Sequence, residues 1–449
     1  MQRVLMAAVC CTVFAVLLPA AGSAGDRYNS RPYRQIVTVP NILQHEQALQ
    51  SIADANGGIR LAGTAGNVQT VDYIASTMTA AGWAVQKQPF VFPYFQELAP
   101  STFSQSAPSA KTFVNGTDFA TMTYSGSGDV TANVTAVGPL NVPIGNTPAG
   151  TTISGCAEAD FAGFPAGNIA LVQRGTCTFG TKAANALQAH ASAVVVFNEG
   201  QPGRTDAVAG TLGAPVAIPA LGATYQLGVD AVTALRANQT VTWHITTSTI
   251  SQNRTTYNVI ADSPWGDPNR VVVVSAHNDS VSAGPGINDD GSGTSMDLEL
   301  ARQLGKEGQL PRNHVRFLWV GAEEEGLLGS NFYVSSLSND ERAKIIAMLD
   351  FDMVASPNYA RQVYDGDGST FGSNVSGPNG SGLIESLFNT WFDSQGQASE
   401  PIPFDGRSDY VAFTKAGIPA GGIFTGAEKI KTEEEQNLFG GTAGGRAAL

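Results

Sequence analysis

Carboxylates and one histidine follow three apolar segments of the sequence. His277 and Asp279 come directly after VVVVSA, and Glu323 and Glu324 come directly after VRFLWVGA. Asp352 follows the third segment, IIAMLDF. Buried carboxylates need a cation or hydrogen-bond donors, and imidazole together with carboxylates is a donor set that binds zinc. The three segments therefore predict a metal site for zinc, with manganese or cobalt as ions that the same ligands would also suit.

A further pair of acids, Asp289 and Asp290, lies in the glycine-flanked turn GINDDGSG. Such a turn lets the backbone fold close to a cation. Taken singly, Asp289 or Glu323 is also typical of a cap at the start of a helix. In combination with the other acids, the metal interpretation is favoured. The adjacent pair Glu323 and Glu324 suits a division in which one carboxylate binds metal and the other takes a proton from water as general base.

Strands and helices alternate around these residues. We expect strands over 84–92, 270–275, 315–320, 345–353 and 418–424, and helices over 67–81, 294–304 and 382–392. Strands separated by helices predict an α/β fold with a mixed, largely parallel sheet flanked by helices. Ligands bind at the carboxyl ends of such strands, which is where the acids and the histidine would meet.

The composition of the sequence changes between the strand expected over 84–92 and the one expected over 270–275. Residues 109–249 form short runs rich in Val, Thr and Gly with few charges, a pattern typical of a mostly β insert. We therefore expect an inserted domain over 109–249, and a principal domain made of residues 25–108 together with 250–449.

The first 24 residues have the pattern of a secretory signal peptide. Arg3 precedes an apolar run, and small residues follow it up to Ala24. A membrane anchor is the alternative, but the run of about fifteen residues is shorter than the roughly 20 that span a bilayer. We expect a secreted, extracellular protein. Its remaining cysteines, Cys156 and Cys177, then predict one disulfide, with two buried free thiols as the alternative.

The composition excludes two classes of partner. Asp and Glu number 38 against 25 Lys and Arg, which gives a formal net charge of -13. This balance argues against nucleic acid and against an anionic membrane surface, because both attract clustered basic residues. The length of 449 residues fits two or three domains. We expect a monomer.

Several motifs resemble the M28 family of zinc aminopeptidases. AHNDSVSAGPGINDDGSG, GAEEEGLLGS, FDM and GRSD occur in the family's order across residues 257–444. The earlier segment GGIRLAGTAGNVQTVDYI resembles the start of the same domain. The resemblance implies the zinc exopeptidase fold, a pair of zinc ions, and a secreted enzyme that removes amino-terminal residues from peptides, with bulky apolar residues preferred.

The resemblance also implies a role for each matching residue. His277 and Asp352 would hold one zinc, Asp289 would bridge the pair, and Glu324 would hold the second ion. Glu323 would be the general base that takes a proton from the attacking water.

Other residues would support the metal ligands or contact the substrate. Asp279 would be the hydrogen-bond partner of His277. Met353, Arg407 and Phe424 fall where the family builds the pocket for the substrate's first residue. For Arg407, a plain surface ion pair is the alternative.

The insert resembles a protease-associated (PA) domain. The resemblance lies in GNIALVQRGTCTFGTKAANALQAHASAVVVFN with Cys156 upstream. In this family the PA domain is thought to cover or gate the active site. A stabilising β module without a role in substrate choice is the alternative.

The sequence departs from the family in one respect. The family's second zinc takes a further histidine, preceded by a tyrosine, beyond the motif GGTAG, which here is residues 440–444. Neither residue occurs between this motif and Leu449, so we expect a truncated peptidase domain whose second zinc site is incomplete. Two alternatives stay open: another zinc hydrolase of this fold, such as a carboxypeptidase or an amidohydrolase, and a catalytically impaired peptide-binding protein.

Overall fold

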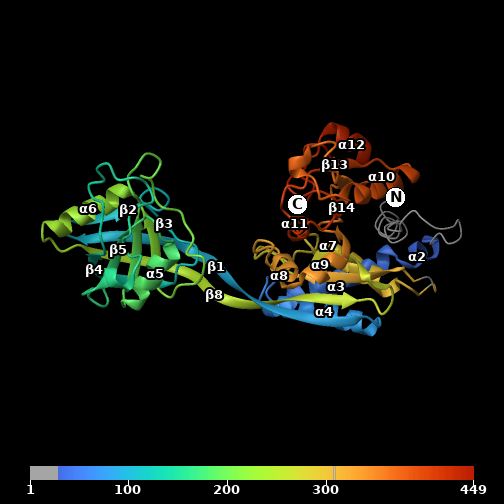
Figure 1. The fold of residues 1–449 in the computed structure, drawn as a ribbon, viewed down its shortest axis with the longest axis horizontal. Helices are drawn as coiled ribbons and strands as arrows, with labels where there is room; N and C mark the ends of the chain where they lie inside the picture. Colours follow the sequence, from blue (N-terminus) through green and yellow to red (C-terminus); the bar gives the residue numbers. More distant parts are fainter. Residues whose placement is uncertain (1–28, 307, 309, 449) are drawn as a thin grey trace. The chain divides into compact units, whose positions relative to one another are not determined.

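The computed structural model describes residues 29–306, 308 and 310–448, and it divides the chain into two compact units (Figure 1). One unit comprises the residues up to Phe90 and those from Thr255 onward, and the other comprises Val91–Arg254. Strands β1 (Ala84–Ala107) and β8 (Thr242–Asp262) each run from one unit into the other. The second unit therefore begins earlier and ends later than the 109–249 insert expected from the sequence, because both connections are long strands.

The first unit is built on a mixed sheet. Besides the C-terminal part of β8, its strands are β9 (Asp267–His277), β10 (Asn313–Val320), β11 (Ile345–Asp350), β12 (Gln362–Tyr364), β13 (Glu400–Ile402) and β14 (Ala420–Phe424). Their order is β13-β12-β14-β11-β9-β10-β8. The four central strands β14, β11, β9 and β10 are parallel. β8 is antiparallel to β10, β12 is antiparallel to β14, and β13 is parallel to β12. The expected mixed, largely parallel sheet is confirmed.

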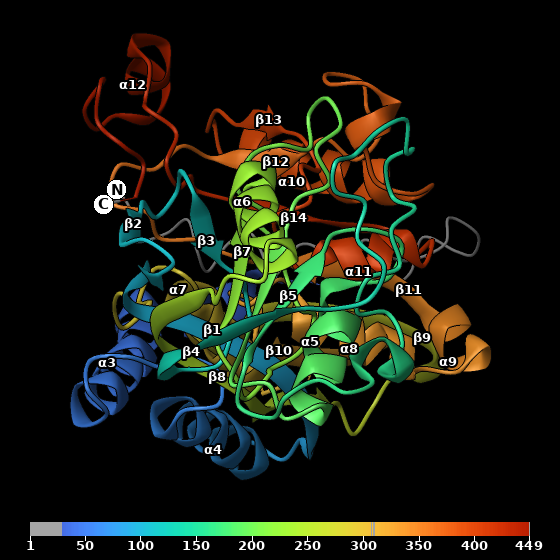
Figure 2. The same ribbon diagram turned by 90° about the vertical axis from the view of Figure 1, so that its left-hand side faces the viewer.

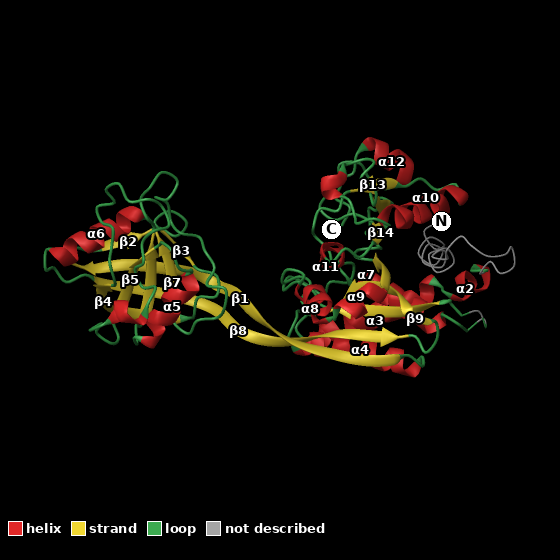
Figure 3. Ribbon diagram, in the orientation of Figure 1, coloured by secondary structure: helices red, strands yellow, loops and turns green. Residues whose placement is uncertain are grey.

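Helices cover both faces of this sheet (Figure 3). The helices of the unit are α2 (Arg31–Ile36), α3 (Val39–Ala55), α4 (Ala65–Ala80), α7 (Gly291–Gln303), α8 (Leu328–Ser336), α9 (Asn339–Lys344), α10 (Ser381–Ser394), α11 (Tyr410–Lys415) and α12 (Glu433–Phe439), with a short 3-10 turn at Ser373–Val375. Val272 and Val274 of β9 pack in one core with α3, α4, α7 and α10. Val271 and Val273 pack in a second core with α8 and α11. This alternation explains the unbroken apolar run Val271–Val274 in β9, since both faces of the strand are buried there.

The central strand β11 ends earlier than the sequence suggested. We expected a strand over 345–353, and the structure ends it at Asp350. Asp352 therefore lies in the loop beyond the sheet edge, and Met353 has a positive φ of 54°. Asp352 thus lies just beyond the end of β11, and His277 is the last residue of β9.

The second unit is built from strands and helices (Figure 2). Its buried side chains form two cores. Besides parts of β1 and β8 it contains β2 (Lys111–Phe113), β3 (Phe119–Thr121), β4 (Gly128–Ala136), β5 (Ile169–Gln173), β6 (Ala193–Phe197), β7 (Ala220–Ala223), the helices α5 (Phe179–Gln188) and α6 (Tyr225–Arg236), and a 3-10 turn at Glu158–Phe161. Its strand order is β8-β4-β5-β6-β7-β3. Ala170 and Val172 of β5 face the core that contains α5, and Ile169 and Leu171 face the core that contains α6. The expected β insert thus has a helix on each face of its sheet.

The two cysteines that remain beyond the expected signal peptide are joined in this unit. Cys156 and Cys177 form a disulfide with their Cα atoms 5.7 Å apart, which confirms the expected pairing. A link across 21 positions stabilises a fold by about 3 kcal/mol in the loop-entropy model. The expected signal peptide, residues 1–24, lies outside the described residues. Within the part of the chain that is described, no helix combines the length and the apolarity needed to cross a membrane.

Candidate metal centre and substrate pocket

Three adjacent parallel strands bring the candidate ligands to one edge of the first unit's sheet. His277 is the last residue of β9, Glu323 and Glu324 follow β10, and Asp352 follows β11. Val320 of β10 pairs with His277 in the β-ladder, so the two strands end level with each other. The apolar strands bury their length in the sheet, and the polar residues begin where the sheet stops.

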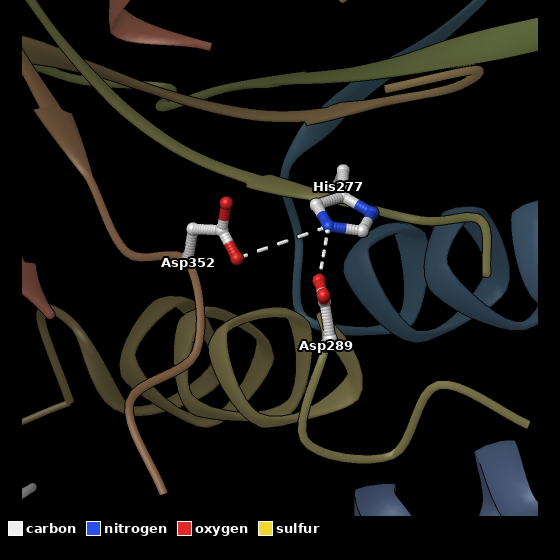
Figure 4. Close-up of side chains that lie close together, drawn as sticks. All are labelled: His277, Asp289 and Asp352. Carbon is white, nitrogen blue, oxygen red and sulfur yellow. Dashed lines mark hydrogen bonds and ion pairs between the residues drawn. The ribbon is translucent and has the colours of Figure 1, made fainter. Parts of the chain in front are cut away.

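The imidazole of His277 lies at the centre of this group (Figure 4). Its Nε2 atom is 2.9 Å from Asp289 Oδ1, 3.8 Å from Glu323 Oε2 and 3.9 Å from Asp352 Oδ1. One ligand atom from each of His277, Asp289 and Asp352 lies within 4.8 Å of the other two. Three of the four residues that the sequence predicted as ligands, His277, Asp289 and Asp352, therefore lie together. The fourth, Glu324, is not part of this cluster and lines the pocket beside it.

Asp279 faces the other ring nitrogen of the same histidine. Its Oδ1 atom is 3.6 Å from His277 Nδ1, and it accepts a hydrogen bond from the Glu323 backbone N–H at 3.2 Å. Asp279 is completely buried. At 3.6 Å the pair is too long for a hydrogen bond, and His277 Nδ1 has no partner among the described residues. Asp279 therefore lies beside the ring of His277 and is hydrogen-bonded to the backbone that carries Glu323.

The buried acids resist ionisation as long as no cation accompanies them. Burial, together with the repulsion of Asp409, Asp352 and other acids, raises the pKa of Glu323 to about 11 despite the opposing charge of His277. Burial also raises the pKa values of Glu324 and Asp352 to about 7. For His277, burial lowers the pKa, but the surrounding carboxylates outweigh it and the pKa is raised well above its usual value. A divalent cation would stabilise the ionised form of every one of these acids.

Unpartnered oxygen atoms support the same conclusion. Among the described residues, several buried carboxylate oxygens have no hydrogen-bond partner: Asp279 Oδ2, Glu324 Oε1, Asp350 Oδ1, Asp352 Oδ1 and Asp409 Oδ1. Buried acceptors without a donor are costly and uncommon in folded proteins. One imidazole nitrogen and several carboxylate oxygens form a donor set that fits zinc. The residues present are therefore suited to hold the metal that the sequence predicts.

The two neighbouring acids before α7 have separate positions. Asp290 caps the helix, because its Oδ1 accepts from the Gly293 N–H at 2.9 Å. Its other oxygen accepts from the His277 N–H at 3.0 Å. The capping role considered for Asp289 thus belongs to Asp290, and Asp289 is left to face His277. Glu323 does not cap a helix either, since α8 begins only at Leu328.

Ser408, in the GRSD motif, contacts two acids at the end of β11. Its hydroxyl oxygen is 2.7 Å from Asp350 Oδ2 and 3.0 Å from Asp352 Oδ2. Asp350 Oδ2 also accepts from the Tyr410 N–H at 3.1 Å. Ser408, which precedes α11, therefore helps to hold the loop that carries Asp352, a role that the sequence did not indicate.

Arg60 is a second residue that reasoning from the sequence missed. It is fully buried, and its guanidinium donates to the backbone carbonyls of Asn278, Pro285 and Gly286 at 2.7, 2.8 and 2.7 Å. Burial lowers its pKa to about 10, while the charge of Asp279 and other acids of the site opposes that shift. Arg60 thus fastens the loop between His277 and Asp289. Its only signal in the sequence is its place within GGIRLAG.

We predict that Arg60→Met lowers the free energy of unfolding of the first unit by at least about 3 kcal/mol, because three carbonyls, one of them fully buried, lose a charged donor. Urea unfolding followed by tryptophan fluorescence measures the change. Arg312→Met is the matched control, since Arg312 is exposed. A loss of less than about 1 kcal/mol for Arg60→Met would contradict this role.

A pocket of about 140 Å³ opens beside the metal-binding group. Asp289, Glu323, Glu324 and Asp352 line it on one side. The rest of the lining is formed by Met353, Tyr364, Ile402, Asp405, Arg407, Ser408, Phe424, Ala427 and Glu428. The three residues that the sequence assigned to a substrate pocket, Met353, Arg407 and Phe424, are therefore all brought to it.

Arg407 is engaged at the border of this pocket. Its Nη1 and Nη2 atoms donate to the two carboxylate oxygens of Glu428 at 3.1 and 2.8 Å. Both side chains are more than half exposed, so solvent screens the pair. The hydrogen bonds and charge of Arg407 lower the pKa of Glu428 to about 2. Arg407 thus lines the pocket and forms a surface ion pair at the same time.

Known aminopeptidases are similar to this chain over nearly its whole length. The chain is 45% identical over 410 residues to an aminopeptidase of Pseudomonas aeruginosa, in an alignment that covers 90% of this chain and 74% of that protein. The chain belongs to peptidase family M28. The M28 family model matches residues 258–438, and the PA domain model matches residues 136–230. Both resemblances noted in the sequence are confirmed.

Other proteins similar to this chain are also named aminopeptidases. A probable leucine aminopeptidase 2 of Aspergillus fumigatus is 42% identical over 444 residues, covering 96% of this chain and 82% of that protein. Among solved structures, an aminopeptidase from Aneurinibacillus is 30% identical with a TM-score of 0.53, covering 87% of this chain and 86% of that one. A zinc aminopeptidase from Bacillus subtilis is 26% identical with a TM-score of 0.51, covering 91% and 90%.

The two family matches fall on different parts of the structure. The M28 match at 258–438 includes all the residues of the candidate metal centre, from His277 to Asp352. The PA match at 136–230 lies within the second unit and includes both Cys156 and Cys177. The metal centre thus belongs to the M28 part of the chain, and the disulfide belongs to the PA domain.

Proposed function

We propose that this M28 protein is a secreted zinc aminopeptidase that removes amino-terminal residues from peptides and prefers bulky apolar ones. One observation carries the proposal: His277 Nε2 lies within 3.9 Å of three carboxylates beside a pocket. The names of the relatives, aminopeptidase and leucine aminopeptidase, support the activity and the apolar preference. The disulfide between Cys156 and Cys177 supports secretion, because such bonds persist in oxidising compartments.

The proposed ligand set divides unequally between two zinc ions. His277, Asp352 and the bridging Asp289 would hold one ion, and Asp289 and Glu324 would hold the other. When bound, such a pair acidifies water and polarises a peptide carbonyl. Three protein ligands are the usual number for a catalytic zinc site, so this chain would bind the first ion tightly and the second weakly. The second site would then be incomplete.

Glu323 would move the proton in this reaction. Its carboxylate would accept a proton from the attacking water at Oε2 and return it to the nitrogen of the departing amine. Asp279 would hold the imidazole of His277 in place and, through the Glu323 N–H, the backbone of the base as well. Both functions depend on the level ends of β9 and β10.

The charges of the pocket favour an aminopeptidase over a carboxypeptidase. A carboxypeptidase needs a cationic side chain to receive the substrate's terminal carboxylate. Among the described residues that line this pocket, Arg407 is the one basic side chain, and it is already paired with Glu428. The other charged residues of its lining are acidic, and they would attract a protonated amino group. Met353, Ile402 and Phe424 supply apolar surface for the first side chain.

We predict that blocking the substrate's amino group lowers kcat/KM at least about a hundredfold. The blocked substrate no longer carries the positive charge that the acids of the pocket would attract. The measurement compares a leucine-initiated peptide with its N-acetyl form, by chromatography of the products. The same peptide with an amidated carboxyl end is the matched control and should be cleaved normally.

Two results would favour the alternatives. Cleavage of the acetylated peptide together with loss of cleavage on amidation would indicate a carboxypeptidase. Peptide binding without hydrolysis in the presence of added zinc would indicate an impaired, peptide-binding protein.

A further inference from the structure

A second group of acids lies outside the candidate zinc centre. Asp365 follows β12, Asp367 lies two residues further in the loop DGDGST, and Glu385 lies near the start of α10. One carboxylate oxygen from each of the three lies within 4.8 Å of the other two. Like charges repel at this distance, so the fold must hold them together.

The buried Asp365 has an oxygen atom that lacks a donor. The residue is completely buried. Its Oδ2 atom accepts from the N–H groups of Thr370 and Phe371 at 3.0 and 2.8 Å. Its Oδ1 atom is also buried, and no hydrogen-bond partner for it occurs among the described residues. A buried carboxylate with one bare oxygen beside two further carboxylates is the surrounding that a cation completes.

Two glycines allow the loop to lie directly on α10. A Cβ atom at Gly366 would come within 2.3 Å of the Ser381 carbonyl oxygen, and one at Gly382 would come within 2.8 Å of Asp367 Cβ. The Gly366 N–H also donates to Glu385 Oε2 at 2.9 Å. The close approach of loop and helix brings Glu385 to the two aspartates.

The donor atoms identify the class of ion. All three side chains offer oxygen, and calcium prefers six to eight oxygen ligands in flexible geometry, whereas zinc prefers nitrogen or sulfur in addition. Asp365, Asp367 and Ser369 also have the spacing of the first three ligands of a calcium-binding loop. Such a loop has glycine at the next position, which is Thr370 here, and takes its last acid from within the loop, where this chain uses Glu385 of α10.

We propose that Asp365, Asp367 and Glu385 bind a calcium ion that fastens the 365–372 loop to α10. The site shares no residue with the candidate zinc centre, so it stands independently of the proposed peptidase activity. It lies next to the substrate pocket in the chain, because Tyr364 lines that pocket and precedes Asp365. Calcium would remove the repulsion among the three acids and leave the first unit more stable to heat.

The test is a titration of the full chain with calcium chloride at fixed, saturating zinc, after calcium has been removed. We expect one site by isothermal titration calorimetry, with Kd of roughly 10⁻⁵ to 10⁻³ M as in sensor and extracellular modules. At a calcium concentration ten times the measured Kd, the unfolding temperature should rise by about 3 °C. Magnesium chloride at the same concentration should give a smaller rise, since magnesium keeps its water ligands.

Two variants and a control decide the location. Asp367→Asn and Glu385→Gln remove charge from side chains that are exposed or half-buried, and each should weaken calcium binding at least tenfold. Asp393→Asn changes an exposed acid at the other end of α10 and should bind as the wild type does. The proposal would be overturned if the wild type showed no saturable calcium binding. It would also be overturned if all three variants bound calcium with the affinity of the wild type. Saturation by further zinc in place of calcium would also overturn it.

Discussion

Replacing Glu323 with glutamine is expected to lower kcat for leucine p-nitroanilide at least about a hundredfold while zinc stays bound. Glutamine has the size of glutamate but cannot accept the proton, and general base catalysis contributes about 10² to 10⁴ in rate. Zinc binding should persist because Glu323 is not one of the proposed ligands. Its Oε2 atom is 3.8 Å from His277 Nε2, near enough to act beside the metal.

The measurement combines steady-state kinetics with the zinc content of the same sample. Glu325→Gln is the matched control, since it makes the same substitution two residues along the chain and Glu325 is not among the described residues that line the pocket. Its kcat should equal that of the wild type. If Glu323→Gln with zinc bound turned over as fast as the wild type, Glu323 would not be the base.

Replacing Asp289 with asparagine is expected to weaken zinc binding and to lower kcat/KM at least about a thousandfold. Asp289 is the proposed bridge, so its loss affects both ions at once. Residues that merely support a ligand change metal affinity or activity by about 10- to 100-fold, and a direct bridging ligand should exceed this. The side chain of Asp289 is 44% exposed, so the substitution should leave the fold intact.

Zinc affinity by competition with a chromogenic chelator, together with peptidase kinetics, measures this effect. Asp340→Asn, an exposed acid of α9, is the control and should keep both properties. Unchanged zinc affinity and unchanged kcat/KM in Asp289→Asn would exclude the bridging role.

The strands that carry the site could be predicted because they are buried on both faces. The segment from Val271 to Val274 has no alternation to indicate a surface, and polar residues begin abruptly after it. The same pattern marks the ends of β10 and β11. Parallel strands present their carboxyl ends at one edge of the sheet. Recognising the three apolar segments as parallel strands was therefore enough to predict that the acids following them lie close to His277.

The supports of the site could not be found in this way. Arg60 lies more than 200 residues before the loop that it holds, and its place within GGIRLAG does not by itself indicate that the arginine is buried. Asp289 and Asp290 are identical in type and adjacent. Only the backbone around them decides which one caps α7 and which one faces His277.

The first and last residues of the second unit could not be predicted from the sequence either. The change in composition near residue 109 reflects where the β insert's own strands begin. The structure makes the division inside β1 and β8, whose Val, Thr and Phe residues continue as strands from one unit to the next. A long strand that serves two units has no turn residue to mark the division.

The central claim is that the cluster around His277 holds the zinc on which peptide hydrolysis depends. Its most direct test is the rate of leucine p-nitroanilide hydrolysis by the metal-free protein as zinc is added back. We predict negligible hydrolysis without metal, and a rate that rises as zinc is added and then saturates. A metal-free protein that hydrolyses the substrate as fast as the zinc-loaded protein would contradict the claim.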